Sequence, residues 1–568
     1  MRLAAPLAAL VIAVTAAAGA LAQAASTSPD KGENGDKGKP AAAAHHETAA
    51  ERSAKEEAEK TATAEVAAGW ARAPVTEREV ITHHSVATPE GELRYAATAG
   101  TLTIRDDEGK PTASIFFVAY TLENPPAGRP RPVTFFYNGG PGSSSMWLHM
   151  GSLAPVRVTT GNPEFIRPAP YGFGPNPHTL LDKTDMVFID APGTGYSRAL
   201  GDTEPKTFWG VDADCDAFAR AIFRYVDKYQ RWGSPKFLFG ESYGTTRSAL
   251  LAWKLQDRGM ALNGVVLLSS ILNFGIRQPG YDEQFIGYLP TYAAAAWYHH
   301  KLANPPADVE QAIAAARDFA FGPYAAALAK GDALPEAERN EIATQMAALT
   351  GLSPTFIEDA NLRVEPALFR KELLRDQRLT IGRYDSRYTG VDASAVGATP
   401  DYDASDAAIS AAFIAAINNY LGPVLGYRTD MTYRPTIYGM EGFKWDWKHK
   451  APGQQERFEQ TTPDVAVDLA AAMRTNPYLR VLSLNGYFDM ATPFSITEYD
   501  LSHMMLEPAE RANVEFRYYP SGHMAYLNPE VLVQMHADLS AFYDEAVASA
   551  ASGAPPHAPV ATSGRGRR

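Results

Sequence analysis

The chain has 568 residues, a net charge of −13 and 45% hydrophobic residues, values that are typical of a globular protein. The excess of negative charge argues against nucleic acid as a partner. The only cysteine is Cys215, which excludes an intrachain disulfide. Three aspartates close to Cys215 in the sequence oppose formation of a thiolate, so we do not expect a catalytic thiol.

The N-terminus has the pattern of a secretory signal over residues 1–24. Arg2 precedes an apolar, Ala-rich run, and 20–22 and 22–24 offer small-residue cleavage sites. An uncleaved membrane anchor is the alternative, but the run is mostly Ala rather than Leu or Ile. We expect no other segment that is long and apolar enough to span a bilayer. The expected location is therefore secreted or periplasmic.

Residues 25–75 have almost no large apolar side chains, so burial cannot offset the entropy of ordering them, and we expect a linker. Apolar runs separated by Gly or Asp turns then predict strands with an antiparallel entry to a larger sheet. Further along, strands alternate with helices, which predicts a parallel sheet with its loops at the carboxyl edge. The predicted strands cover 80–82, 102–104, 113–120, 133–137, 185–190, 236–240, 264–269, 480–484 and 514–519.

The alternation breaks between about residues 275 and 445, where Ala-rich helical patterns and aromatic loops predict an insertion over the sheet edge. Helical patterns cover 207–230, 291–331, 334–349, 405–420, 495–507 and 528–548. The expected organisation is a signal peptide at 1–24, a linker at 25–75, a core in two parts at 76–274 and 446–548, a cap at 275–445 and a disordered tail at 549–568.

Residues 236–251 contain the candidate nucleophile. The apolar run at 237–239 predicts a buried strand, Gly240-Glu241-Ser242-Tyr243-Gly244 follows it, and a helical stretch comes next. This is the context of a nucleophile elbow, whose tight turn leaves no room for side chains two positions to either side of the serine. Ser242 would lie at a helix N-terminus, where the helix dipole favours negative charge.

Three further patterns lack features that a bound phosphate, dinucleotide or metal ion requires. The loop at 138–145 follows a predicted strand but lacks the Lys-Ser/Thr ending of a phosphate-binding loop. The loop at 190–197 lacks the glycine spacing of a dinucleotide fingerprint. The pairs His83-His84 and His299-His300 lack the helical i, i+4 spacing of a zinc site. We therefore expect no cofactor, and the first loop, upstream of Ser242, is a candidate oxyanion hole.

A serine hydroxyl needs a base to take its proton, and behind a nucleophile elbow the order is Ser, acid, His, each after a strand. Asp489 follows the predicted strand at 480–484 on a tight loop that contains Gly486. His523 follows the predicted strand at 514–519. The other late histidines lie in helical patterns or in the tail: His503, His536 and His557. Asp489 and His523 are the candidate acid and base, and Asp500 is the nearest rival acid.

Five motifs, in this order, resemble those of the serine carboxypeptidase family, acid carboxypeptidases with an α/β-hydrolase fold. They are Asn138-Gly-Gly-Pro-Gly142, Asp190-Ala-Pro-Gly-Thr-Gly-Tyr-Ser197, Gly240-Glu-Ser-Tyr-Gly244, Asn485-Gly-Tyr-Phe-Asp489 and Ser521-Gly-His-Met524. The resemblance covers about residues 100–275 and 475–545. It implies a mostly parallel central sheet with helices on both faces and a largely helical cap insertion.

The resemblance also implies roles for eight residues. Ser242 matches the nucleophile, His523 the general base and Asp489 the residue that orients His523. Gly140 and Tyr243 match the backbone N–H donors of the oxyanion hole. Three residues match positions that bind the free carboxylate of the peptide: Asn138, Gly139 and Glu241. Elementary electrostatics supports the match of Glu241, because a glutamate beside a developing oxyanion must be protonated or share a proton with another carboxyl group.

The implied function is that of a secreted serine-type carboxypeptidase, which acts on peptides with a free C-terminus through an acyl-enzyme. No nucleic acid and no stable membrane insertion after signal cleavage are expected. The family's second glutamate has no counterpart in 149–155, its disulfides cannot form, and Ser143 stands where the family often has cysteine. An esterase or acyltransferase on the same scaffold is the alternative, and an inactive exported binding protein is a third hypothesis.

Overall fold

The structure is a computed structural model of the chain, and it describes residues 73–126, 128, 130–453 and 458–552. The predicted signal peptide at 1–24 and nearly all of the predicted linker lie outside the described residues. The final helix continues to Ser552, beyond its predicted end at 548, so the predicted tail begins within a helix. The rest of that tail is also outside the described residues.

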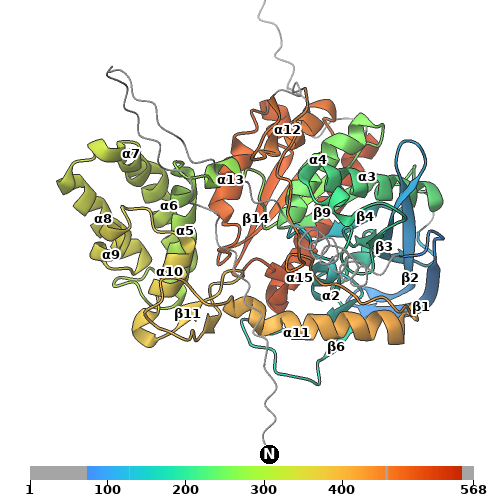
Figure 1. Cartoon of the computed structure of the whole chain (residues 1–568), viewed down its shortest axis with the longest axis horizontal. Helices are drawn as coiled ribbons and strands as arrows, with labels where there is room; N and C mark the ends of the chain where they lie inside the picture. Colours follow the sequence, from blue (N-terminus) through green and yellow to red (C-terminus); the bar gives the residue numbers. More distant parts are fainter. Residues whose placement is uncertain (1–72, 127, 129, 454–457, 553–568) are drawn as a thin grey trace, which may run out of the picture. The chain divides into compact units, whose positions relative to one another are not determined.

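A ten-stranded sheet forms the centre of the described chain (Figure 1). Its strands are β1 Glu79–Thr88, β2 Gly91–Arg105, β3 Pro111–Leu122, β4 Val133–Tyr137, β7 Asp185–Ile189, β8 Arg198–Ala199, β9 Lys236–Glu241, β10 Gly264–Leu268, β13 Arg480–Gly486 and β14 Val514–Tyr519. The order is β1-β2-β3-β7-β4-β9-β10-β13-β14, with β8 paired to β3. In this spatial order, neighbouring strands are antiparallel from β1 through β2 and β3 to β7. They are parallel from β7 through β4, β9, β10 and β13 to β14.

Helices cover both faces of this sheet, so the chain has the α/β-hydrolase fold that the sequence predicts. The core helices are α2 Met146–Gly151, α3 Val211–Lys228, α4 Tyr243–Asp257, α12 Ala466–Thr475, α13 Phe494–Ser502, α14 Pro508–Arg511 and α15 Pro529–Ser552. Phe135 of β4 contacts Tyr225 of α3, whereas Phe237 of β9 stacks on Tyr543 of α15. Strand side chains alternate between the two faces, and each face has its own helical cover.

The predicted insertion at 275–445 contains seven α-helices among the described residues. They are α5 Glu283–Tyr298, α6 Val309–Phe319, α7 Ala325–Leu328, α8 Glu336–Thr350, α9 Pro354–Asp359, α10 Pro366–Glu372 and α11 Ala404–Asn419. The helical pattern predicted over 291–331 is therefore not continuous. Pro305 and Pro306 lie between α5 and α6, where a helix cannot continue. The helices α5–α10 bury an apolar cluster that also includes Met490 and Ile496 of the core, and Figure 1 shows these helices as a group beside α13.

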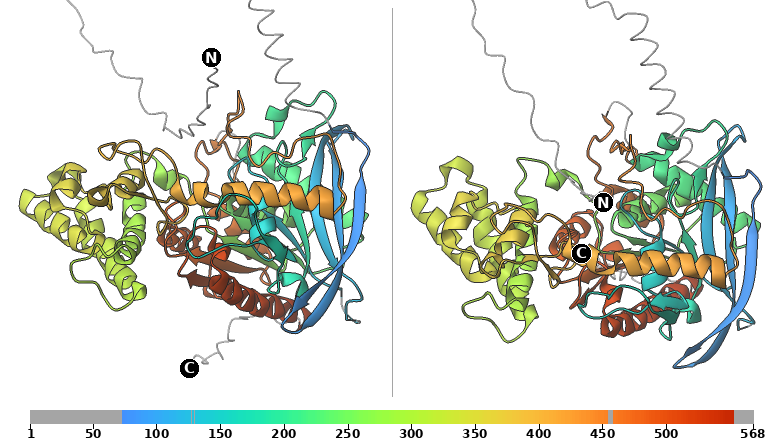
Figure 2. Two further views of the ribbon diagram at one scale, coloured as in Figure 1. Left: turned by 90° about the horizontal axis from the view of Figure 1, so that it is seen from below. Right: turned by 60° about the horizontal axis from the view of Figure 1, so that its bottom comes forward.

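Helix α11 packs against the core rather than with α5–α10. Figure 2 shows it running across the body that contains the sheet, and Ala408, Phe413 and Ile417 are buried in the main hydrophobic cluster. Residues Ala404–Val424 are long and apolar enough to cross a membrane by length and composition, so the expectation of no such segment was wrong. Of this stretch, 44% is buried inside the molecule.

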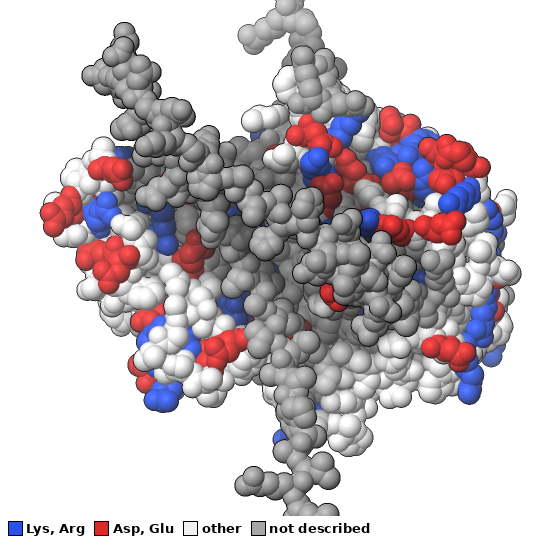
Figure 3. All heavy atoms as spheres, in the orientation of Figure 1, with Lys and Arg blue, Asp and Glu red and all other residues white. Residues whose placement is uncertain are grey.

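Charged side chains of both signs lie next to one another on the face shown in Figure 3. Where α3 and α4 reach this surface, Asp216 pairs with Arg220, Lys254 and Arg258. Such partly exposed pairs contribute little to stability, about 0–1 kcal/mol each. On this face, acidic side chains are thus interspersed with basic ones.

Small hairpins complete the described elements: β5 Val156–Val158 with β6 Phe173–Pro175, and β11 Thr380–Ile381 with β12 Thr389–Gly390. The parallel strands β9, β13 and β14 end at one edge of the sheet. The loops that carry the candidate nucleophile, acid and base follow these three strands, which places them at the same edge.

Candidate active site

Ser242 lies in the sharp turn between β9 and α4. Its backbone has φ 60° and ψ −129°, a conformation that non-glycine residues rarely adopt. The flanking glycines are required by close packing. A Cβ at Gly240 would lie 2.1 Å from the Gly244 carbonyl oxygen, and one at Gly244 would lie 2.7 Å from that of Tyr137. The turn therefore has the strained geometry of a nucleophile elbow.

Asp489 and His523 form a buried hydrogen-bonded pair. His523 Nδ1 lies 2.8 Å from Asp489 Oδ2, and both side chains are almost fully enclosed. The loop after β13 supplies hydrogen-bond donors to the other oxygen of the Asp489 carboxylate: Ala491 N–H and Thr492 N–H donate to Oδ1 at 2.8 and 3.0 Å. Thr492 Oγ1 donates to Oδ2 at 2.7 Å. These bonds fix Asp489 in the orientation that an imidazole-orienting carboxylate needs.

Ser242 and His523 are both hydrogen-bonded to the chain at the end of β10. Ser242 N–H donates to the Leu268 carbonyl oxygen at 3.0 Å. The hydroxyl of Ser269, the residue after Leu268, donates to the His523 carbonyl oxygen at 2.7 Å. Burial lowers the pKa of His523, but the Asp489 carboxylate, its hydrogen bond and the charge of Glu241 outweigh burial and raise that pKa above the ordinary value.

The glycine-rich loop after β4 packs against the start of α4. A Cβ at Gly139 would lie 2.3 Å from Tyr243 N, so only glycine permits this approach. Gly140 is exposed and has φ +112°, in the region that favours glycine. The first N–H groups of a helix have no intrahelical acceptor. The loop that contains Gly140 thus lies against the start of α4 at Tyr243, the two places where the sequence predicts the N–H donors of an oxyanion hole.

Glu241 precedes Ser242 and is only 2% exposed. Tyr526 donates a hydrogen bond of 2.9 Å to Glu241 Oε2, and Asn138 also stabilises this carboxylate. Burial raises the pKa of Glu241 to about 7, although His523, Tyr526 and Asn138 oppose the rise. A carboxyl group of this kind is protonated in acid and able to share its proton with a second carboxylate.

Two contributors to this site have no signal in the sequence. Tyr526 is 285 residues from Glu241 and belongs to no motif. The insertion supplies a loop in which the carbonyl oxygens of Arg383 and Tyr384 accept from Met490 N–H at 3.0 Å and His523 N–H at 2.6 Å. The Tyr384 ring lies 5.1 Å from the His523 ring. The insertion thus supports the loops that carry the acid and the base.

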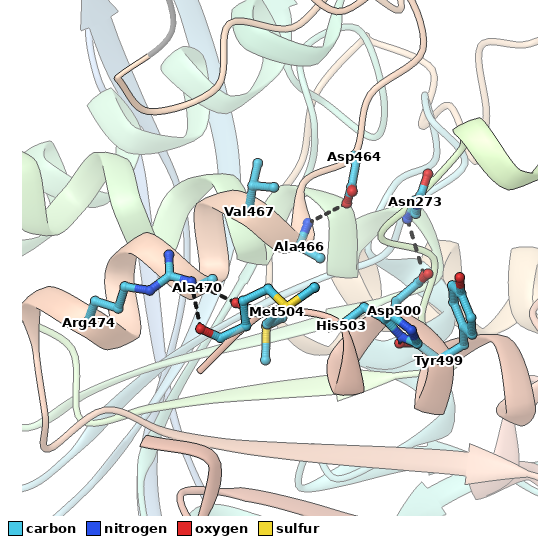
Figure 4. Close-up of a pocket in the computed structure, with 11 residues that line it drawn as sticks. Asn273, Asp464, Ala466, Val467, Ala470, Arg474, Tyr499, Asp500, His503 and Met504 are labelled. Atoms are coloured by element: carbon cyan, nitrogen blue, oxygen red, sulfur yellow. Dashed lines mark hydrogen bonds between the residues drawn. The ribbon is translucent and has the colours of Figure 1, made fainter. Parts of the chain in front are cut away.

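The rival candidates lie elsewhere. Asp500 lines a separate cavity of about 150 Å³ and accepts from Asn273 N–H at 3.3 Å (Figure 4). Burial, with a smaller contribution from Asp464, raises the pKa of Asp500 to about 8, so this acid is largely neutral at pH 7. Cys215 is buried in α3, and burial raises the pKa of its thiol.

Comparisons with known proteins agree with the motifs. Residues 89–283 match the family model described as serine carboxypeptidase. Serine carboxypeptidase-like 51 of Arabidopsis thaliana is 28% identical over 172 residues, 28% of this chain and 34% of that protein. The carboxypeptidase Y homolog of Arthroderma benhamiae is 31% identical over 148 residues, 26% of this chain and 27% of that protein.

Among solved structures, KEX1(DELTA)P, a prohormone-processing carboxypeptidase from Saccharomyces cerevisiae, is 13% identical with a TM-score of 0.45, covering 79% of this chain and 92% of that one. The curated matches span about a third of those relatives' length or less. The family match includes Ser242 and the glycine-rich loop, whereas Asp489 and His523 lie beyond residue 283. The predicted resemblance to the serine carboxypeptidase family is therefore confirmed, and residues 89–283 are the part of the chain that matches its model.

Proposed function

We propose that this protein is a serine-type carboxypeptidase that releases C-terminal residues from peptides through an acyl-enzyme. The observation that carries the proposal is the buried Asp489–His523 pair at the same sheet edge as Ser242, with an enclosed glutamate directly before the serine. The family match supports it independently, because the match ends before the acid and the base.

In the proposed mechanism, Ser242 Oγ attacks the carbonyl carbon of the last peptide bond and its proton passes to His523 Nε2. Asp489 holds Nδ1–H and stabilises the imidazolium. The N–H groups of Gly140 and Tyr243 receive the developing oxyanion. His523 then gives the proton to the leaving amine. Water, activated by the same imidazole, hydrolyses the acyl-enzyme and restores the serine.

The substrate's terminal carboxylate is assigned to Asn138, Gly139 and Glu241. An ionised glutamate repels a carboxylate, so a bound proton must lie between them. The pKa of Glu241 of about 7 makes that proton available in acid. We therefore expect peptidase kcat/KM to be highest at acidic pH, whereas esters and C-terminally amidated substrates remain active toward neutral pH.

One observation favours an esterase or acyltransferase as the second candidate. The stretch His149–Pro155 has no carboxylate, and the hydroxyl of the buried Ser152 donates back to its own helix, to the Leu148 carbonyl oxygen at 2.6 Å. A fluorophosphonate probe tests for an active serine. Comparing kcat/KM for a blocked dipeptide with that for its methyl ester then separates the candidates. Ester turnover without peptide turnover at any pH from about 4 to 8 favours the esterase.

We also propose that the protein is exported, because 1–24 has the pattern of a secretory signal. N-terminal sequencing of the mature protein from the culture medium or periplasm tests this. A protein that retains Met1 and stays in the cytoplasm contradicts the proposal.

A further inference from the structure

The hydroxyl of Tyr526 is buried beside Glu241, the residue that precedes the candidate nucleophile Ser242. Tyr526 is fully buried and donates to Glu241 Oε2 at 2.9 Å. Leu148 N–H donates to Asn138 Oδ1 at 2.9 Å, which turns the Asn138 amide nitrogen toward the other two side chains. Asn138 also interacts with Glu241 and Tyr526 and lowers the pKa of each. Three side chains from separate elements thus lie together beside the nucleophile, and the Tyr526–Glu241 hydrogen bond joins two of them.

The packing around Tyr526 is specific to its ring. Gly151, at the end of α2, faces Tyr526, and a Cβ at this glycine would lie 2.6 Å from Tyr526 Cε2. A larger residue at 151 would require the ring to move. Gly151 also belongs to the stretch that contains no carboxylate. The absence of a side chain at Gly151 therefore provides the space through which Tyr526 reaches Glu241.

We propose that Tyr526 is a positioning residue for recognition of the peptide's terminal carboxylate: its hydroxyl holds Glu241 Oε2 and leaves Oε1 to share a proton with the substrate. This inference rests on the proposed carboxypeptidase function and adds to it a residue outside the family motifs. No covalent step is involved. The hydrogen bond orders Glu241 before substrate binds, which reduces the entropy lost on binding.

The sign of the expected pH effect follows from the groups that face Glu241. The charge of His523 lowers the pKa of Glu241, and the charge of Asp489 raises it. The neutral groups Tyr526 and Asn138 both lower the pKa of Glu241. Removing the Tyr526 hydroxyl removes one stabiliser of the anion. The pKa of Glu241 then rises, and Glu241 keeps its proton to higher pH. The alkaline limb of peptidase kcat/KM should move upward by about one pH unit, since a donor to a charged group contributes roughly that much.

The test measures pH profiles of kcat/KM for a blocked dipeptide and for its C-terminal amide, in the wild-type protein and in Tyr526→Phe. We expect the dipeptide's alkaline limb to move upward in Tyr526→Phe, giving roughly fivefold higher kcat/KM at one pH unit above the wild-type midpoint. The amide profile should not move. Tyr519→Phe is the matched control, because Tyr519 is also fully buried and donates to a carboxylate, Asp538, at 2.9 Å.

A second variant keeps the hydroxyl at position 526 and should reverse the direction of the pH shift. Burial raises the pKa of the Tyr526 phenol well above its ordinary value, so a difluorotyrosine at position 526 remains neutral and is a stronger donor. It should move the dipeptide's alkaline limb to lower pH. An unchanged dipeptide limb in both variants overturns the inference, as does an equal shift in Tyr519→Phe. Wild-type dipeptide and amide profiles that coincide instead remove the carboxylate-recognition function itself, and the two failures are therefore distinguishable.

Discussion

Substituting Asp489 by Asn should leave the fold intact and remove most of the turnover. The side chain is fully buried, and Oδ1 accepts from Ala491 N–H and Thr492 N–H at 2.8 and 3.0 Å. In Asp489→Asn these two fixed donors require the amide oxygen at the Oδ1 position. The amide NH₂ must then face His523 Nδ1, because exchanging its atoms would oppose NH₂ to two N–H donors.

The size of the effect follows from the imidazole tautomer. With an NH₂ donor opposite Nδ1, His523 must accept at Nδ1 and carry its proton on Nε2, the nitrogen that should receive the Ser242 proton. In a serine protease with this geometry the same change lowers kcat by about 10⁴. That factor corresponds to about 5.4 kcal/mol of transition-state stabilisation. We expect a loss of that order here, together with a lower pKa of His523, because the Asp489 charge raises it in the wild-type protein.

The assay is kcat/KM for a blocked dipeptide and its methyl ester between about pH 4 and 8, with thermal unfolding as the control for folding. Asp500→Asn is the matched variant, because Asp500 is also a buried acid and lies in a separate cavity. It should retain turnover within a few-fold of wild type. Retention of more than a tenth of the activity in Asp489→Asn, or loss of activity in Asp500→Asn, would refute this assignment of the acid.

Three further changes test separate parts of the structure. Glu241→Gln should bring the pH profiles of free-acid and amidated substrates together, because a neutral amide meets a carboxylate without a proton. Arg247→Met should reduce the free energy of unfolding by about 3–5 kcal/mol in urea titrations, since it leaves the buried Asp214 without its partner at 2.7 Å. Gly139→Ala should abolish turnover, because its Cβ would lie 2.3 Å from Tyr243 N and must displace the loop.

Each of these expectations has a result that contradicts it. If Glu241→Gln leaves a gap of more than one pH unit between the two profiles, another group binds the carboxylate. A stability loss below about 1 kcal/mol in Arg247→Met would mean that the ion pair is hydrated or replaceable. Gly174→Ala is the control for Gly139→Ala, because a Cβ at Gly174 meets no atom within 4 Å. Wild-type turnover in both glycine variants would show that the loop accommodates a side chain.

The order of strands and loops could be predicted because short local patterns specify each of them. The runs that form β4, β9 and β13 are short and largely apolar, β14 alternates apolar and charged residues, and a glycine lies at or soon after the end of each strand. The strained turn at Ser242 was predictable because only glycines fit beside it. Asp489 and His523 could be chosen from the sequence alone for a related reason: each follows a strand that ends at the same sheet edge.

The remaining parts depend on contacts between distant segments. The bond from Tyr526 to Glu241 joins residues 285 apart, and nothing in the sequence near Tyr526 indicates it. The contact of the Tyr384 carbonyl with His523 N–H comes from a loop of the insertion that has no regular pattern. Helix α11 was predicted as part of the cap, but its Ala-rich sequence is apolar on all sides and did not indicate which surface would bury it, and that surface is the core.

The most direct test follows an N-acylated peptide with a free C-terminus by mass spectrometry at about pH 5, with wild-type protein and with Ser242→Ala. The account predicts stepwise loss of single residues from the C-terminus with the wild-type protein. It predicts no loss with Ser242→Ala, which should unfold at the wild-type temperature and take up no fluorophosphonate. Internal cleavage, or C-terminal loss that persists in Ser242→Ala, would contradict the account.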